Sequence, residues 1–190
     1  MRLVRQILDY EPWNDQEAMD RSMILDALKS QANIFRRENK QAHMTASAWV
    51  ANPERSKVLM VYHNIYDSWS WMGGHADGEE DLLAVAVREV QEESGLQHVR
   101  TVTDAILSLE ALTVDGHWKD GEYVSSHLHL NLTYLLEANE NDPLSVKADE
   151  NSGVAWFDLD EAVRASSEPW IREHVYRKLN EKLRSFSADL

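Results

Sequence analysis

The stretch from residue 74 to residue 96 constrains the fold of this chain more than any other part of its 190 residues. As a helix that begins after Asp81, a favourable N-cap residue, it places Glu89, Glu92 and Glu93 at positions i, i+3 and i+4, on one face. A separate apolar face suits a core and contains Leu83, Ala86, Val87 and Val90. Three like charges this close destabilise an isolated helix. The pattern therefore predicts a hard cation such as Mg²⁺ or Mn²⁺, which prefers oxygen ligands.

The same stretch carries a set of fixed residues at defined spacing. They are Gly74, Glu80, Arg88, Glu89, Val90, Glu92, Glu93, Gly95 and Leu96. This spacing resembles the Nudix box of the Nudix hydrolases at every fixed position. Each strict residue type has a chance frequency of roughly one in fifteen, so an accidental match of the whole set is very rare. The resemblance implies a Nudix-type α/β/α sandwich and hydrolysis of a phosphoanhydride bond, as a pyrophosphatase acts.

Hydrophobic periodicity predicts the other elements. Helices are expected over 14–32, 158–165 and a C-terminal segment; strands over 45–51, 57–62, 99–114, 125–134 and 154–157; and a loop over 115–122. The fold class is therefore α+β, with an added N-terminal helix and a C-terminal helix. We expect residues 1–42 to form a helical extension packed on a Nudix domain of residues 43–190. Met19 and Met23 lie on the apolar stripe of the first helix, which indicates core or homodimer packing.

Composition excludes several classes of function. The net charge of −14 argues against binding of DNA or RNA as a polymer, because no basic stripe is present for the phosphates. The chain contains no cysteine, which rules out disulfides, thiolate nucleophiles and cysteine zinc sites. No apolar run approaches membrane-spanning length, and the first residues lack a signal-peptide pattern. We expect a cytoplasmic protein that acts on a small phosphorylated substrate.

The resemblance also implies roles for individual residues. The metal ligands for Mg²⁺ (or Mn²⁺) are expected to be Glu89, Glu92, Glu93 and the backbone carbonyl around Gly73. Glu80 and Arg88 correspond to an orienting pair, since a guanidinium can hold a carboxylate in a fixed fork. Met72 stands where proline is the commoner family residue, which loosens the loop but removes no ligand.

A general base is needed to help deprotonate the attacking water. Some members of the family place a glutamate on a loop before a late strand that ends in tryptophan. Glu150, six residues before Trp156, resembles that arrangement. Glu93 serves as the base in members that lack the loop glutamate, so both residues stay candidates.

Two further groups are candidates for binding substrate. Strand alternation places His127, His129 and Asn131 on one face of the strand over 125–134, and we expect this face to open into a polar cleft. Arg36 and Arg37 form a basic pair that suits contacts with phosphates. His43 and His75, with His127 and His129, also raise the question of a histidine metal site, although single histidines more often serve no such role.

Two alternatives to hydrolysis remain open at the level of sequence. An isomerase of the isopentenyl-diphosphate type shares the fold, and His43 and His75 resemble its metal histidines, but that family uses a cysteine which this chain lacks. A non-catalytic nucleotide-sensing module usually loses carboxylates of the box, and here all are present. The marks of the ADP-ribose, dinucleoside polyphosphate and NADH subfamilies are absent around 110–114, so the substrate stays unassigned.

Overall fold

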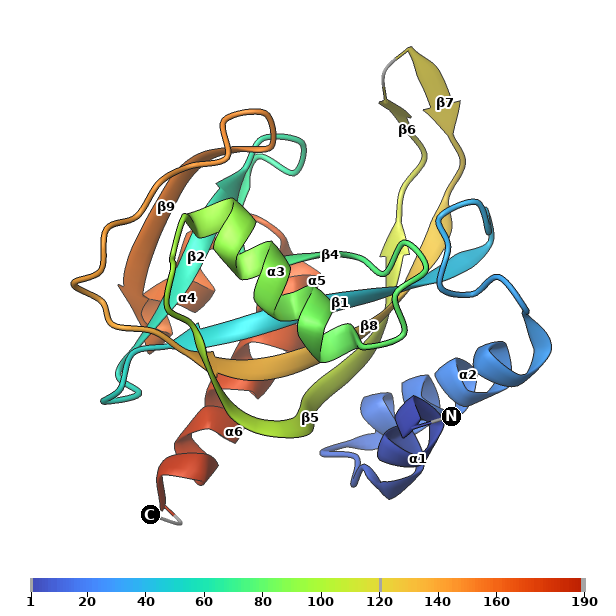
Figure 1. Ribbon diagram of the computed structural model, residues 1–190, viewed down its shortest axis with the longest axis horizontal. Coiled ribbons are helices and arrows are strands. Elements are labelled where there is room, and N and C mark those ends of the chain that lie inside the picture. The colour runs from blue at the N-terminus through green and yellow to red at the C-terminus, as the bar shows by residue number, and fades with distance from the viewer. Residues whose placement is uncertain (1, 120, 189–190) are drawn as a thin grey trace.

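The computed structural model describes residues 2–119 and 121–188, which are built around one mixed sheet. The sheet has seven strands in the order β3-β2-β1-β8-β5, with β4 also paired to β1 and β9 to β2 (Figure 1). Its strands are β1 Ala42–Ala51, β2 Lys57–His63, β3 Ser68–Ser70, β4 Met72–His75, β5 Arg100–Val114, β8 His127–Glu137 and β9 Asn151–Asp158. The β1–β8 pair is parallel, whereas the other pairs are antiparallel. A separate hairpin, β6 His117–Lys119 and β7 Glu122–Val124, extends beyond the sheet.

Helices cover both faces of the sheet. They are α1 Arg2–Asp9, α2 Asp15–Ser30, α3 Leu82–Ser94, α4 Leu159–Ala165, α5 Pro169–Ile171, the π-helical turn η1 Arg172–Tyr176 and α6 Arg177–Ala188. In Figure 1, α3 lies in front of the sheet, α6 lies behind it, and α1 and α2 pack together near the N-terminus. The expected α/β/α sandwich is therefore confirmed, with a pair of N-terminal helices in place of one.

Strand alternation divides the core into two clusters. Even-numbered residues of β1 and β8, such as Met44 and Leu132, pack with α1, α2 and α3. Trp49 and Leu135 point to the other side and pack with Leu179 of α6. Because side chains alternate across a strand, both faces of the central strands must be apolar over part of their length.

Local signals set the bounds of the two longest predicted helices. The side chain of Asn14 accepts a hydrogen bond from the Glu17 amide (3.0 Å), and that of Asp81 from the Ala84 amide (3.2 Å). Gly95 ends α3 in the left-handed conformation, with φ of +74°, which glycine adopts without a steric penalty. The predicted N-cap role of Asp81 is confirmed.

Several sequence expectations about local structure are wrong. Helix α1 was not predicted, and the loop expected over 115–122 contains most of the β6–β7 hairpin. Met19 and Met23 are 71% and 46% exposed, so the core packing expected of them is wrong, whereas homodimer packing stays a prediction. The apolar residues of α2 that are buried are Ile24, Leu25 and Ala27, which lie on the side of the helix that packs against the core.

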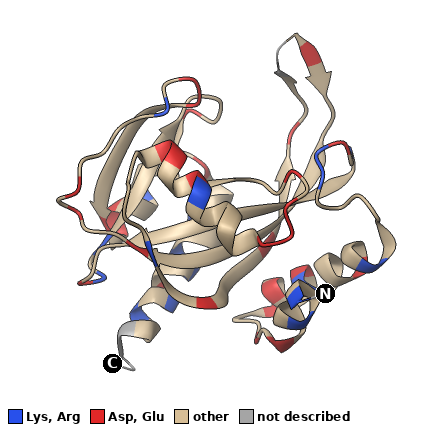
Figure 2. Cartoon of the chain, viewed as in Figure 1, with Lys and Arg blue, Asp and Glu red and all other residues tan. Residues whose placement is uncertain are grey.

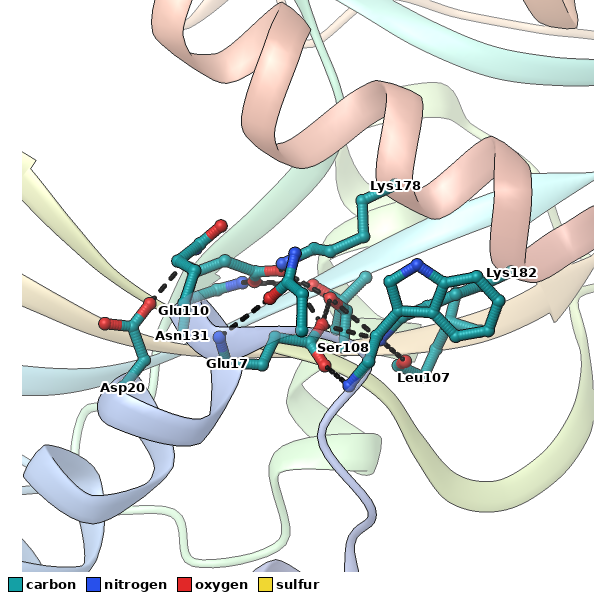
Figure 3. A network of polar contacts seen from close by, with 12 residues as sticks. Glu17, Asp20, Leu107, Ser108, Glu110, Asn131, Lys178 and Lys182 are labelled. Carbon is teal, nitrogen blue, oxygen red and sulfur yellow. Dashed lines mark hydrogen bonds and ion pairs between the residues drawn. The ribbon is translucent and has the colours of Figure 1, made fainter.

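A buried ionic network joins α2, β5 and α6 (Figure 3). Glu17 lies 3.1 Å from the Nζ atom of Lys178 and 2.5 Å from that of Lys182, and Lys178 also pairs with Glu110 at 3.0 Å. All four side chains are at least nine-tenths buried. Two carboxylates and two ammonium groups balance in charge, which is the condition for burying ions at an acceptable desolvation cost.

Candidate active site at the box helix

Glu93 is the most deeply buried carboxylate of the box, with 4% of the residue exposed. Its Oε1 atom accepts a hydrogen bond from the amide of Gly73 (2.9 Å), and its Oε2 atom accepts one from the Nδ2 atom of Asn151 (3.0 Å). Burial raises the pKa of Glu93 to about 7, although these two hydrogen bonds oppose the shift. Helix α3 thus holds a carboxyl group with a pKa near neutral pH against the two glycines of strand β4.

Glu89 approaches the same strand at Gly74. A Cβ atom added to Gly74 would lie 2.5 Å from the carboxyl carbon of Glu89, so only glycine admits the carboxylate this close to the backbone. Burial raises the pKa of Glu89, while Arg88 counteracts the shift. The two glycines therefore provide a backbone surface against which the carboxylates of α3 pack.

Arg88 forms ion pairs with two carboxylates of its own helix, α3. Its Nη2 atom lies 3.1 Å from Glu89, and its Nε atom lies 3.8 Å from Glu92. The expected partner, Glu80, is exposed and forms no ion pair with Arg88 in the described part of the chain. Glu92 is one turn beyond Arg88 on the helix, so this pairing needs no tertiary contact. The predicted pair of Glu80 with Arg88 is therefore not formed, and an orienting role of Arg88 towards Glu89 stays a prediction.

The loop before β9 lies against α3, the helix that carries the box carboxylates. The Nζ atom of Lys147 lies 3.6 Å from Glu92 and 3.0 Å from Glu150, which places Glu150 beside the helix. The backbone carbonyl of Glu150 accepts a hydrogen bond from the amide of Asn64 (3.0 Å), which fixes the loop to the end of β2. Lys147 and Asn151 were not predicted from sequence; their proximity to Glu150 along the chain was the only available signal.

The box residues suit a divalent cation by their donor chemistry, because they offer carboxylate oxygens beside the two glycines of β4. The oxygens of Glu89, Glu92 and Glu93 do not all lie within 4.8 Å of one another. Arg88 and Lys147 instead neutralise Glu92, which is the half-exposed member of the three. Figure 2 shows acidic segments on α3 and on the loops around it, with few basic ones between them. A bound divalent cation would therefore compete with Arg88 and Lys147 for the carboxylate of Glu92.

The predicted basic pair lies near the turn that follows β4. Arg37 holds Asp77 through both carboxylate oxygens, with the Nε atom 2.7 Å from Oδ1 and the Nη2 atom bonded to Oδ2. The guanidinium of Arg36 packs against Gly78. Both side chains are exposed, and their role in contacting phosphates stays a prediction.

His127 and His129 are half-buried next to His43 and His75. Burial lowers the pKa of His129 to about 2. Asn131, expected on the same open face, is only 1% exposed: it accepts hydrogen bonds from Thr45 and Ser47 and donates one to Glu110. That part of the expectation was wrong, because polar side chains of β1, β5 and β8 satisfy the hydrogen-bonding groups of Asn131.

Comparison with known proteins identifies the family. The NUDIX domain model matches residues 41–179, which include the box helix and the loop before β9. The chain belongs to the Nudix family. It is a Nudix-type pyrophosphohydrolase, and Nudix hydrolases use divalent metal ions. Among curated proteins, none matches this sequence.

Solved structures share the fold of this Nudix hydrolase at low sequence identity. An Ap4A hydrolase of C. elegans, in a binary complex, has a TM-score of 0.55 and 19% identity, over 77% of this chain and 98% of that one. A NUDIX family hydrolase of Clostridium perfringens has a TM-score of 0.54 and 20% identity, over 76% and 97%. The dihydroneopterin triphosphate pyrophosphohydrolase of E. coli has a TM-score of 0.53 and 13% identity, over 77% and 96%. Within the described residues of this Nudix hydrolase, no helix has the length and apolarity to cross a membrane.

Proposed function

We propose that this Nudix hydrolase is dependent on Mg²⁺ (or Mn²⁺) and cleaves the phosphoanhydride bond of a nucleoside diphosphate linked to another moiety, or of a related phosphorylated small molecule. The observation that carries the proposal is the packing of Glu89 and Glu93 against Gly73 and Gly74. The similar structures named for an Ap4A hydrolase and a dihydroneopterin triphosphate pyrophosphohydrolase support this substrate class. We also propose that the protein is cytoplasmic.

The chemistry requires neutralised phosphoryl oxygens, an activated water and in-line positioning. A divalent cation, when bound, supplies the neutralisation and lowers the pKa of a bound water. The protein would hold it through Glu89, Glu92 and Glu93, while Arg88 keeps Glu89 in position. Hydrogen bonds from the Gly73 amide and from Asn151 hold the Glu93 carboxylate in place, which makes it a candidate to accept the proton of the attacking water.

Glu150 is the second candidate for the base. Its side chain is half-exposed, and its carboxylate lies 3.0 Å from the Nζ atom of Lys147. An exposed carboxylate beside the box helix can accept a proton and release it to solvent. We therefore propose that either Glu93 or Glu150 accepts the proton, and mutation of Glu150 distinguishes the two.

The test is turnover of a substrate panel by the full chain. Nucleoside diphosphate derivatives and nucleoside triphosphates are offered with Mg²⁺ and with Mn²⁺, and released phosphate or mononucleotide is measured. Glu92→Gln and Glu93→Gln should each lower kcat by about 10²–10⁴, because each removes a carboxylate without changing volume. Glu161→Gln, on exposed α4, is the matched control.

Two outcomes would contradict the proposal. If both box variants keep the rate of the parent, the carboxylates do not carry the reaction. If no compound of the panel is hydrolysed but one raises the melting temperature, the chain senses the nucleotide instead of cleaving it.

A further inference from the structure

Four histidines from three strands meet on the side of the sheet away from α3. In register, His43 of β1 lies opposite His129 of β8, and Thr45 of β1 lies opposite His75 of β4. The ring centroids of His43 lie 5.0 Å from His75 and 4.9 Å from His129, and those of His75 and His129 are 4.9 Å apart. Each of these three histidines offers a ring nitrogen, and the three nitrogens all lie within 4.8 Å of one another.

This histidine cluster is separate from the carboxylates of the box. Gly74 faces α3, since a Cβ atom there would touch Glu89. His75 is the next residue, and successive residues of a strand point to opposite faces. Strand β4 therefore faces the carboxylates of α3 on one side and carries the imidazole of His75 on the other.

The ring of His43 is already oriented and protonated in the way that a metal ligand requires. Its Nδ1 atom lies 3.0 Å from the carbonyl oxygen of Asn39, to which the ring donates its N–H. The proton is then on Nδ1, and Nε2 carries a lone pair. That Nε2 atom is buried without a hydrogen-bond partner, in a residue only 4% exposed. Histidines that bind metals usually donate the second N–H to a carbonyl or carboxylate, which fixes ring and tautomer.

His127 extends the cluster in the same way. Its Nδ1 atom donates to the carbonyl of Ser125 (2.8 Å), which leaves a lone pair on Nε2. The Nε2 atoms of His127 and His129 are 3.2 Å apart. Two nitrogens bound to one tetrahedral zinc ion at 2.0–2.1 Å are separated by about 3.3 Å, so this spacing also suits neighbouring ligands.

We propose that His43, His75 and His129 bind one divalent transition-metal ion of the zinc class, with His127 beside His129. Imidazole nitrogen selects Zn²⁺, Co²⁺ or Ni²⁺ over Mg²⁺, which prefers oxygen. The ion would bind the Nε2 atom of His43, which has no hydrogen-bond partner, and would join β1, β4 and β8 next to the glycines of β4. This site differs in position and donor type from the carboxylate site, and it does not depend on the proposed reaction.

The first experiment measures binding of the metal alone. Tag-free full chain, treated with a chelator and dialysed, is titrated with Co²⁺ in excess Mg²⁺, and visible absorption and bound metal are recorded. One Co²⁺ per chain, displaced by Zn²⁺, is expected. His75→Gln and His129→Gln should each weaken Co²⁺ binding at least tenfold, whereas His98→Gln, an exposed histidine, and Glu92→Gln should not.

The second experiment needs no variant. X-ray absorption at the zinc edge of the loaded parent chain should give a coordination shell with at least three imidazole nitrogens, and Zn²⁺ should raise the melting temperature. The proposal is overturned by a lack of stoichiometric Co²⁺ binding or by an all-oxygen shell. It is equally overturned if Glu92→Gln abolishes binding while both histidine variants retain it.

Discussion

At the scale of single residues, Glu93 is the carboxylate of the box whose negative charge is least favoured by its surroundings. The side chain is buried, and the negative charges of Glu89 and Glu150 add to the effect of burial. Without a bound cation, the ionised form is therefore held in an unfavourable environment, although an amide and an asparagine side chain partly stabilise it. A cation at the box would reverse this balance by favouring the charged form.

This gives a prediction for stability in the absence of divalent metals. Because the folded pKa of Glu93 is about 7 and its ordinary value is 4.5, the folded state binds the proton more tightly. Its contribution is fully present below pH 4.5 and is lost as the pH rises through 7. Glu93→Gln should therefore be more stable than the parent at pH 8, by about 1–3 kcal/mol, in urea denaturation with a chelator present. A parent stability that is equal to the variant's at both pH 5 and pH 8 would show that Glu93 is not perturbed.

The roles of Glu150 and Asn151 can be separated by comparing activity with stability. Glu150→Gln should lower kcat by about 10²–10⁴ if it is the base, with little change in Tm, because its side chain is half-exposed. Asn151→Ala should instead shift the pH profile of kcat towards alkaline pH, because it removes a hydrogen bond that favours ionised Glu93. A kcat for Glu150→Gln within tenfold of the parent assigns the base to Glu93.

At the scale of elements, the ionic network connects α2 with β5 of the sheet and with α6. Lys182 donates to Glu17, to Tyr10 and to the carbonyl of Leu107. Glu17 also accepts from Tyr10 and from Ser108. Satisfied polar networks of this kind specify one arrangement of elements, while loss of one member leaves an uncompensated buried charge.

Glu17→Gln should therefore destabilise the fold by about 3–5 kcal/mol, because two buried ammonium groups would share one remaining carboxylate. Chemical denaturation monitored by tryptophan fluorescence gives the free energy of unfolding. Glu17→Gln with Lys182→Met should recover part of the loss, since the second change removes an unpaired charge. A double variant that is less stable than Glu17→Gln would contradict this account.

The same network predicts a response to acid. Burial acts to raise the pKa of Glu17, but Lys178 and Lys182 outweigh it and bring the pKa to about 2, below the ordinary 4.5. Glu17 therefore contributes stability above pH 4.5 that is lost as the pH falls towards 2. The parent should lose stability over this window, and Glu17→Gln should lose less, as measured by denaturant midpoints at stepwise pH.

Elements were predictable from sequence where their signal is local. Helix α3 is set by Asp81, an apolar stripe and Gly95, all within one short segment. The placement of Glu17 was not predictable, because its partner Lys182 lies 165 residues away along the chain. The site divides in the same way: the box carboxylates follow from spacing, whereas Lys147, Asn151 and the meeting of His43 with His129 depend on how distant strands pair.

At the scale of the whole molecule, the N-terminal helices are joined to the rest by apolar packing and charge. Leu3, Ile7 and Ile24 are buried in the same cluster as α3, and Glu17 reaches the C-terminal helix. The division into a helical extension, residues 1–42, and a Nudix domain, residues 43–190, stays a prediction. The packing indicates that the first part is an integral component of the fold.

A chain without residues 2–30 should accordingly fail to fold stably at 25 °C. The deletion exposes part of the first core cluster and leaves Lys182 without its carboxylate partner. Circular dichroism and a thermal melt measure the outcome, and the same deletion with Lys182→Met should retain more structure. An unchanged melting temperature for the deleted chain would show that the helices are an appendage.

The parallel pairing of β1 with β8 has a consequence for synthesis on the ribosome. β1 is complete once Ala51 has emerged, but its partner is complete only after Glu137. Over that interval one long edge of an apolar strand stays open in the nascent chain, while β2 and β4 can cover only the other edge. Such edges pair readily with other chains, and closing them depends on contacts distant in sequence. The middle of this sheet is therefore assembled late, and the growing polypeptide is most prone to aggregate before β8 arrives.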